Sequence, residues 1–189
     1  MRLALEGIRI MDLSRVVSGP YCTMMLADMG ADVIKIEEPG RGDESRGYAP
    51  ILPSGESSDF ISLNRNKKSI TVNLKSAGGK EIVRRLARVS DILVENFKVG
   101  NMDRLGLGYE ELRRINPRLI YCGISGYGEK GPYRDRPAYD LMIAGYAGLQ
   151  SMTGEPNGPP IAPGIPVSDS YGSLHAAVGI LTALYNRTV

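Results

Sequence analysis

The stretch GIRIMDLSRVVSGPYCTMMLADMGADVIKIE, residues 7–37, places two apolar, β-branched runs on either side of a segment with helical spacing. The runs at 7–14 and 31–37 are typical of buried strands, and glycine and proline mark the ends of the helical segment 19–30. A strand, a helix and a second strand in this order predict two parallel strands joined by a right-handed crossover.

The same alternation continues along the chain. Strand-like runs recur at 91–97 and 119–128, and segments with helical spacing occur at 76–90 and 108–117. We therefore predict an α/β fold, with a Rossmann-like, largely parallel sheet that is flanked by helices and followed by long C-terminal helices.

The remaining segments add three expectations. Residues 38–60 are polar and rich in glycine, proline and serine, and they are too long for an ordinary connection, so we expect a functional or a mobile loop. Residues 61–75, ISLNRNKKSITVNLK, place two β-prone runs around a basic turn, which predicts an antiparallel hairpin. Two mostly apolar helices are expected at about 139–152 and 170–187.

The composition limits the possible classes of function. The 189 residues suffice for one well-packed domain, or for one domain and an arm. The 23 lysines and arginines nearly balance 21 aspartates and glutamates, and the net charge of +2 favours neither nucleic acid nor a membrane as partner. Apolar stretches are too short to span a bilayer, and the first residues lack the core of a signal peptide.

The two cysteines, Cys22 and Cys122, lie far apart and form no CxxC pair. A reducing cytoplasm is the simplest setting for such cysteines, and we expect no metal site. The first turn, DLSRVVSGPYC, lacks the GxGxxG spacing of a dinucleotide site, so NAD binding is not supported. The GRGDES sequence at 40–45 is a weak phosphate-binding signal, because it follows a predicted strand through a loop.

Candidate catalytic groups are few. The single histidine, His175, lies in an apolar helical run and is interpreted as a core residue on a different helix face from Asp169. General-base chemistry at neutral pH would then need a perturbed carboxylate or lysine. Asp140 and Asp169 each precede an apolar helix, and for each the simplest interpretation is a helix N-cap.

Three basic residues lie in or near loops at the carboxyl ends of predicted strands, namely Arg46, Lys98 and Arg104. Ligands of open α/β sheets bind at this edge, so these residues indicate either an anionic ligand or solvated surface charge.

Five blocks of sequence, read together, resemble a known family. They are residues 7–46, 63–75, 91–112, 124–142 and 166–187, and they cover essentially the whole chain. In this order they are similar to the class III coenzyme A (CoA) transferases of the CaiB/BaiF type, which include formyl-CoA transferase and carnitine CoA-transferase. The resemblance implies that residues 1–189 are the N-terminal CoA-binding and catalytic region of the family's interlocked fold, without its second domain and return segment.

The resemblance also implies a chemistry. Asp169 matches the family's nucleophile, which attacks an acyl-CoA donor to form a mixed anhydride and then an aspartyl-CoA thioester, before a small carboxylic acid takes the CoA. A carboxylate with an ordinary pKa of about 3.9 is ionised at neutral pH and needs no histidine. The implied CoA-binding residues are Val17, Ser18, Val72, Asn73, Leu74, Lys75, Asn96, Phe97, Lys98, Arg104, Tyr139 and Asp140.

Some positions depart from the family pattern. Glu38 and Pro137 stand where formyl-CoA transferase-like members have basic residues. In the related α-methylacyl-CoA racemases a catalytic histidine matches Tyr139, and a tyrosine with a pKa of about 10 is a poor base, which disfavours a racemase.

Two further expectations concern partners. The family's length and dimeric state imply either a homodimer or pairing with a chain that supplies the C-terminal half. A non-catalytic module that binds CoA or serves assembly, and that needs such a partner chain, is the alternative to a transferase.

Overall fold

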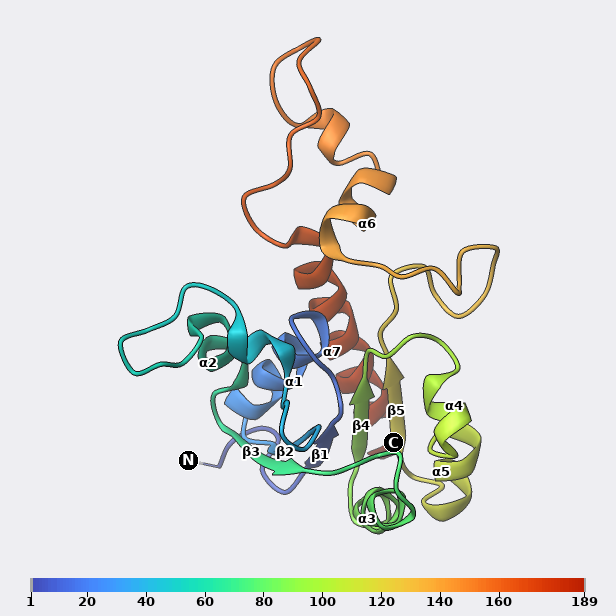
Figure 1. Ribbon diagram of the computed structural model, residues 1–189. Coiled ribbons are helices and arrows are strands. Elements are labelled where there is room, and N and C mark those ends of the chain that lie inside the picture. Colours follow the sequence, from blue (N-terminus) through green and yellow to red (C-terminus); the bar gives the residue numbers. More distant parts are fainter. Residues whose placement is uncertain (1, 189) are drawn as a thin grey trace.

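A computed structural model of the chain describes residues 2–188 and contains one five-stranded, fully parallel sheet (Figure 1). The strand order is β3-β2-β1-β4-β5. The strands are β1 (Arg9–Asp12), β2 (Asp32–Glu37), β3 (Lys67–Thr71), β4 (Ile92–Glu95) and β5 (Ile120–Gly123). This order and the parallel pairing confirm the predicted Rossmann-like α/β fold.

Helices cover both faces of the sheet. Helices α1 (Ser18–Asp28) and α7 (Val167–Thr188) pack on one face, while α3 (Ala77–Arg88), α4 (Asn101–Leu105) and α5 (Tyr109–Ile115) pack on the other (Figure 1). Successive side chains of a strand point to opposite faces, so both faces of the central strands must be apolar. Ile10 belongs to the core under α1 and α7, and the adjacent Met11 belongs to the core under α3 to α5.

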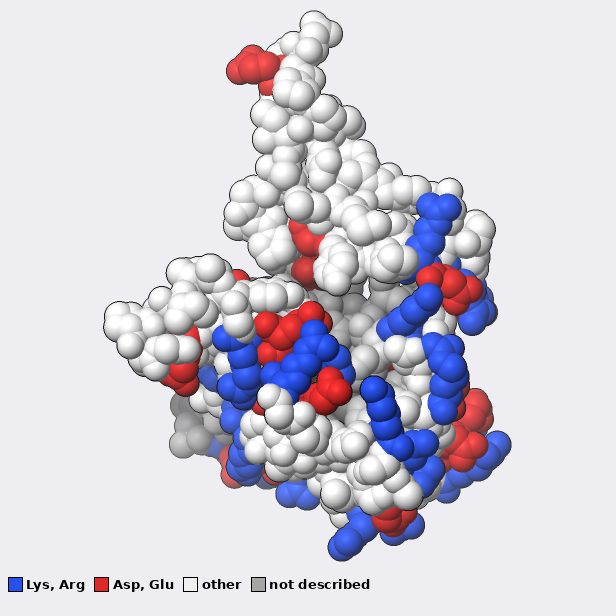
Figure 2. Space-filling model, in the orientation of Figure 1, with Lys and Arg blue, Asp and Glu red and all other residues white. Residues whose placement is uncertain are grey.

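Part of the chain segment that connects β5 to α7 projects from the body of the molecule (Figure 1). It contains α6 (Asp140–Tyr146) and a short 3-10 turn (Gln150–Met152), where we predicted one helix at about 139–152. The helix is interrupted because Gly148 adopts a φ of +83°, in the left-handed region. Between Asp140 and Pro166 this projection carries two charged residues, Asp140 and Glu155, and its surface is otherwise uncharged (Figure 2).

The predicted hairpin at 61–75 is wrong. Its first run belongs to helix α2 (Ser58–Asn64), and only its second run forms a strand, which pairs with β2 in parallel. The helix forms because the Ser57 hydroxyl caps it and accepts a hydrogen bond from the Phe60 N–H at 3.3 Å. The predicted strand at 119–128 is also shorter, since β5 ends at Gly123 and the following residues form a loop.

The long segment 38–60 contacts β2 near its start, where Asp43 pairs with Lys35 and Arg46 pairs with Glu37. It contains a 3-10 turn (Glu44–Gly47), which Asp43 caps, and an isolated bridge between Ile51 and Ser57.

Among the helices of residues 2–188, none has the length and hydropathy that a membrane-spanning segment needs.

Candidate functional site

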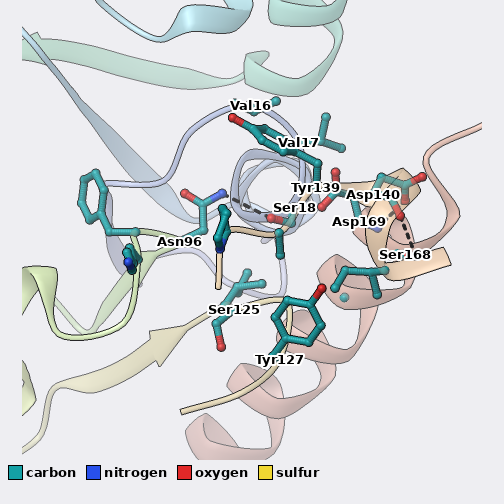
Figure 3. Close-up of a pocket in the computed structure, with 18 of the residues that line it drawn as sticks. Val16, Val17, Ser18, Asn96, Ser125, Tyr127, Tyr139, Asp140, Ser168 and Asp169 are labelled. Atoms are coloured by element: carbon teal, nitrogen blue, oxygen red, sulfur yellow. Dashed lines mark hydrogen bonds between the residues drawn. The ribbon is translucent and has the colours of Figure 1, made fainter. Parts of the chain in front are cut away.

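Two adjoining cavities open at the carboxyl edge of the sheet. The first, of about 520 Å³, is lined by residues that follow β1, β4 and β5 and by the first turns of α6 and α7 (Figure 3). The second, of about 450 Å³, is lined by residues that end or follow β2, β3 and β4. The strand order reverses between β1 and β4, and open α/β sheets bind ligands at such a switch point.

Asp169 and all the CoA-binding residues that the family resemblance implies line at least one of these two cavities. The first cavity contains Val17, Ser18, Asn96, Phe97, Lys98, Tyr139, Asp140 and Asp169. The second contains Val72, Asn73, Leu74, Lys75, Phe97 and Arg104. Phe97 and Arg15 line both cavities, and the Arg15 guanidinium lies 4.9 Å from the centre of the Phe97 ring. These two side chains therefore form the boundary between the cavities.

The turn after β1, residues 14–18, forms one wall of the first cavity. The Asn96 side chain binds both backbone groups of Arg15: the Arg15 N–H donates to Oδ1 at 2.8 Å, and Nδ2 donates to the Arg15 carbonyl at 2.8 Å. Asn96 Nδ2 also donates to the Ser18 hydroxyl at 3.2 Å. Asn96 thus holds this turn in place, in addition to lining the cavity.

A glycine is required where this turn enters α1. A Cβ atom on Gly19 would lie 2.0 Å from the Cβ of Ser14, which is far inside van der Waals contact. Only a residue without a side chain allows the chain to double back this tightly, and so brings Ser18 to the mouth of the cavity.

Asp169 does not cap its helix, so the N-cap interpretation is wrong. Helix α7 begins at Val167, and Asp169 is its third residue. Its backbone N–H donates to Oδ1 of Asp140 at 3.1 Å, so the Asp140 carboxylate binds the free N–H at the start of α7 (Figure 3). The Asp169 side chain is left to line the cavity.

The same interpretation is wrong for Asp140, because Asp140 is the first residue of α6 and Tyr139 occupies the cap position without a capping side-chain bond. A second contact joins α7 to the turn after β1. The buried Ser173 hydroxyl lies 2.6 Å from the carbonyl oxygens of both Ser18 and Asp169. The candidate nucleophile and the turn are therefore fixed relative to each other.

The pKa of Asp169 is raised above its ordinary value. Burial is the largest cause of the higher pKa, the negative charge of Asp140 adds to it, and the polar side chain of Ser18 opposes both. A carboxylate that is partly removed from water and lies beside a like charge is less well stabilised than a free one. It is correspondingly more reactive toward an electrophile.

Replacing Asp140 with asparagine should lower the pKa of Asp169. The substitution removes the like charge, while the amide oxygen can still accept the Asp169 N–H. The measurement is an NMR titration of the ¹³C-labelled Asp169 carboxyl group in both proteins, with Asp91→Asn as a control at the opposite edge of the sheet. An unchanged or higher midpoint in Asp140→Asn would contradict this electrostatic account.

The structure also changes the interpretation of two residues, His175 and Arg46. His175 is exposed on α7 and its Nδ1 lies 2.9 Å from the Tyr171 carbonyl, so the prediction of a core histidine is wrong. Arg46 lies outside both cavities, pairs with the Glu37 carboxylate at 2.7 Å and lies over the Phe60 ring. It therefore stabilises the segment 38–60, whereas Lys98 and Arg104 line the cavities.

The sequence reasoning missed several arginines of the cavity walls. Arg134 and Arg136 line the first cavity, and Arg41 lines the second. Arg136 is adjacent to Pro137, and Arg41 shares a wall with Glu38, so cations lie near both positions where the sequence departs from formyl-CoA transferase. Inspection of the immediate neighbours of these positions would have found them.

No group of three or more histidine, cysteine, aspartate or glutamate side chains within residues 2–188 is arranged to hold a metal ion. Both cysteines are free, and burial raises the pKa of each thiol. The first cavity itself brings the carboxylates of Asp140 and Asp169 together with the basic side chains of Lys98, Arg134 and Arg136.

Comparisons with known proteins identify relatives of this chain. The family model described as CoA-transferase family III matches residues 5–189. The chain is 46% identical over 183 residues to the succinyl-CoA:glutarate CoA-transferase of Mus musculus, covering 97% of this chain and 42% of that protein. It is 48% identical to a formyl-CoA:oxalate CoA-transferase of Streptomyces avermitilis, covering 99% of this chain and 45% of that protein.

Among solved structures, a CAIB/BAIF family protein from Brucella suis superposes with a TM-score of 0.95 at 41% identity. The match covers 100% of this chain and 50% of that one. The chain thus spans less than half the length of the curated relatives it matches and about half of the solved structure.

Proposed function

Because the chain belongs to CoA-transferase family III, we propose that it transfers CoA from an acyl-CoA donor to a small carboxylic acid. The observation that carries this proposal is the position of Asp169, a partly buried carboxylate in a cavity that adjoins a second cavity with basic walls. No histidine is needed, since the nucleophile is a carboxylate.

We propose that CoA lies across both cavities. Arg104, Lys75 and Arg41 line the second cavity and offer cations for the phosphate groups. The pantetheine arm then passes the boundary at Arg15 and Phe97, and the thioester reaches Asp169 in the first cavity. Such an arrangement uses every residue that the family resemblance implies for CoA binding.

The first half of the proposed reaction releases the donor acid. An Asp169 oxygen attacks the donor thioester carbonyl, the C–S bond breaks, and CoA leaves as its thiolate from a mixed anhydride. The thiolate then attacks the aspartyl carbonyl carbon, and the bond from that carbon to the bridging oxygen breaks. The donor acid departs with one oxygen from Asp169, and an aspartyl-CoA thioester remains.

The second half repeats these steps with the acceptor. The acceptor carboxylate attacks the aspartyl thioester and displaces the CoA thiolate, which then attacks the acceptor carbonyl carbon of the new anhydride. Asp169 is regenerated with one oxygen that came from the acceptor. The activation of the thioester is kept throughout, provided that water is excluded from the cavity.

Two alternatives are distinguished by specific features. A racemase would need a proton-transfer base, but Tyr139 stands at the position of the racemase histidine, and His175 lies outside both cavities. A non-catalytic CoA-binding module would bind CoA in the second cavity and leave Asp169 unmodified. Adduct formation at Asp169 separates it from a transferase.

We also propose that the protein acts in the cytoplasm and as part of an assembly. The free cysteines are consistent with a reducing compartment. Large apolar side chains are exposed along α6 and α7, including Tyr146, Tyr171 and Val178. A second copy, or a chain that supplies a C-terminal half, is expected to cover this face, and sedimentation of the protein tests for it.

The test of the proposed function is intact-protein mass spectrometry. The protein is incubated with succinyl-CoA or formyl-CoA, the donors in the names of its relatives, and the reaction is quenched with hydroxylamine, which converts an aspartyl anhydride or thioester to a hydroxamate. A hydroxamate that maps to Asp169 supports the transferase. CoA binding without modification of Asp169 would favour the non-catalytic module.

A further inference from the structure

The backbone is strained beside the candidate nucleophile. Val16 adopts a φ of +65°, in the left-handed region that β-branched residues strongly disfavour. Val16 and the next two residues, Val17 and Ser18, line the first cavity. The surrounding structure must hold Val16 in this conformation, because strained residues persist only where other contacts fix them.

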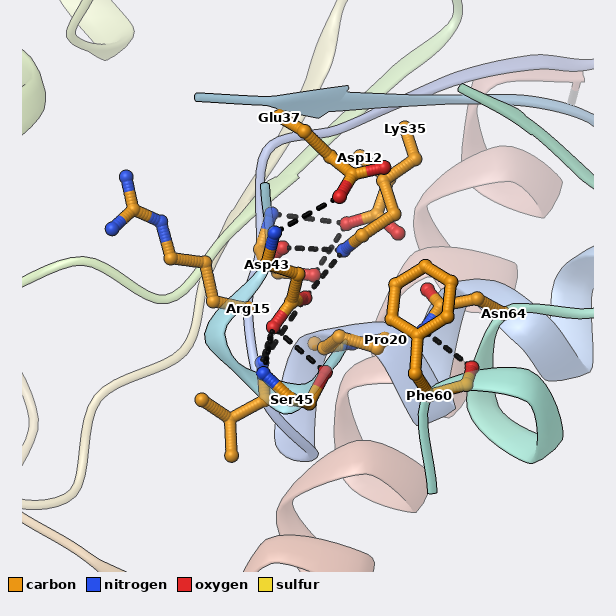
Figure 4. Close-up of polar contacts among 12 residues, drawn as sticks. Asp12, Arg15, Pro20, Lys35, Glu37, Asp43, Ser45, Phe60 and Asn64 are labelled. Atoms are coloured by element: carbon orange, nitrogen blue, oxygen red, sulfur yellow. Dashed lines mark hydrogen bonds and ion pairs between the residues drawn. The ribbon is translucent and has the colours of Figure 1, made fainter. Parts of the chain in front are cut away.

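The contact at Val16 comes from Asp43. The Val16 N–H donates to both carboxylate oxygens of Asp43, at 3.2 and 3.3 Å (Figure 4). Asp43 is only 2% exposed and also accepts hydrogen bonds from the backbone N–H and the hydroxyl of Ser45. Its position is therefore set by the 3-10 turn that it caps.

Lys35 completes this contact from the sheet. Its side chain is 1% exposed, and its Nζ lies 2.8 Å from Oδ2 of Asp43 and donates to the Ser14 carbonyl at 2.9 Å (Figure 4). Burial alone would raise the pKa of Asp43, but the charge and hydrogen bond of Lys35, together with the hydrogen bonds from Ser45, hold this pKa below the ordinary value. Asp43 is therefore an anion at neutral pH.

The turn is held from two sides. Asn96 binds the backbone of Arg15 on the β4 side, and the Asp43–Lys35 pair binds residues 14 and 16 on the β2 side. At the end of this turn, the Ser173 hydroxyl lies 2.6 Å from the Ser18 carbonyl oxygen and 2.6 Å from the Asp169 carbonyl oxygen, so the turn contacts the helix that carries Asp169. The orientation of Val16 thus decides where Ser18 meets the nucleophile.

We propose that Asp43 is a positioning residue: through its bond to Val16 N–H it keeps the strained turn in the shape that places Val17 and Ser18 against Asp169. This inference rests on the proposed function for its effect on reaction rate, but not for its effect on the turn. It also gives the long segment 38–60 a role, namely to supply Asp43 to the turn that lines the first cavity. The GRGDES sequence then serves the turn, since the Asp43 and Ser45 N–H groups donate to Glu37 and Asp43 and are not free for a phosphate.

The test compares Asp43→Asn with Asp91→Asn. Asp91 is a matched control, because it also accepts a backbone N–H, that of Arg9 at 2.9 Å, and pairs with a basic side chain, Arg187 at 2.8 Å, but lies at the opposite edge of the sheet. Amide hydrogen exchange is measured residue by residue without substrate. In Asp43→Asn, exchange at 16–18 should accelerate at least about tenfold relative to the control, because the turn opens locally.

The second readout is the rate of hydroxamate formation at Asp169 with succinyl-CoA, beside the Kd for CoA. A displaced turn should slow the reaction by on the order of a hundredfold and change the Kd by less than about threefold. A purely structural role would instead lower Tm while leaving the rate per folded molecule unchanged.

A rescue variant adds a specific check. Glycine adopts positive φ without strain, so Val16→Gly in the Asp43→Asn background should restore at least part of the lost rate. If Asp43→Asn does not fold, Asp43→Glu keeps the charge opposite Lys35, moves the carboxylate relative to Val16, and is read in the same way. Unchanged exchange at 16–18 together with an unchanged rate would overturn the proposal.

The outcomes for the two proposals are separable. If the wild-type protein forms no hydroxamate, the proposed function fails, and the exchange measurement alone decides the role of Asp43. If the wild-type protein forms it and Asp43→Asn does so equally fast, the positioning role fails and the proposed function stands.

Discussion

Replacing Asp169 with asparagine is expected to reduce CoA transfer by a factor on the order of 10⁴ or more, as happens when the nucleophile of a covalent mechanism is removed. The amide has nearly the shape of the carboxylate but is a poor nucleophile, so the anhydride cannot form. The Kd for CoA should change little, because the cations proposed to bind the CoA phosphates, Arg41, Lys75 and Arg104, line the second cavity and not the first. Steady-state transfer from succinyl-CoA to glutarate and calorimetric binding of CoA measure the two effects.

His175→Gln is the matched control for this variant. His175 lies on the same helix as Asp169, but it is exposed and lies outside both cavities. Its substitution should leave transfer unchanged. Substantial transfer by Asp169→Asn would show that another group carries the covalent step.

Replacing Lys67 with methionine is expected to lower the free energy of unfolding by about 3–5 kcal/mol, the cost of leaving a buried charge without its partner. The Lys67 side chain is 2% exposed, and its Nζ donates to Oδ2 of the fully buried Asp12 at 3.0 Å and to the Pro20 carbonyl at 2.9 Å. The substitution would leave the Asp12 carboxylate without this hydrogen-bonded partner inside the protein.

The adjacent Lys68 provides the control. Its side chain is 75% exposed and pairs with Asp32 at the surface, so Lys68→Met should cost no more than about 1 kcal/mol. Urea unfolding at pH 7 measures both variants. Equal losses for the two lysines would contradict the view that burial determines the contribution of these ion pairs.

The same pair makes a prediction for acid stability. Burial alone would raise the pKa of Asp12, but Lys67, Lys35 and two hydroxyl groups lower it from 3.8 to about 2. A carboxylate whose pKa is lower in the folded state stabilises the fold above its unfolded pKa, and this stabilisation is lost as pH falls through its folded pKa. Stability should therefore fall between about pH 4 and pH 2, and Lys67→Met should unfold at higher pH than the wild-type protein.

Much of the fold was predictable from the sequence because the central strands are buried on both faces. In β4, the consecutive apolar residues Ile92, Leu93 and Val94 are all fully buried, and such a run is typical of a strand in a parallel sheet. The hairpin predicted at 61–75 was wrong because a short apolar run fits a strand or a helix equally well. The Ser57 cap and the pairing of β3 with β2 decide between them, and the pairing is a tertiary contact.

Helix α7 shows a second limit of prediction from the sequence. The buried face of α7 carries Ser173, Ala177 and Ile180, whereas Tyr171 and Val178 are exposed. Small residues face α1 because the two helices pack closely, so the apolar pattern alone could not identify the buried face. His175 was therefore misplaced.

The candidate site was predictable where a residue follows a strand or matches a family block, and Asp169 is the main example. The role of Asp43 was not predictable, because it depends on contacts with Val16 and Lys35, 27 residues away and on a neighbouring strand. The Asp140 carboxylate at the start of α7 depends equally on a contact between two helices.

The most direct test of the account is the transfer of an oxygen atom to Asp169. The protein is given succinyl-CoA and glutarate labelled with ¹⁸O in its carboxylates, and the peptide that contains Asp169 is analysed by mass spectrometry after turnover. The proposed mechanism predicts that Asp169 gains ¹⁸O from the acceptor, since the bridging oxygen of the second anhydride stays on the enzyme. CoA transfer to glutarate without ¹⁸O in Asp169 would contradict a covalent role for this residue.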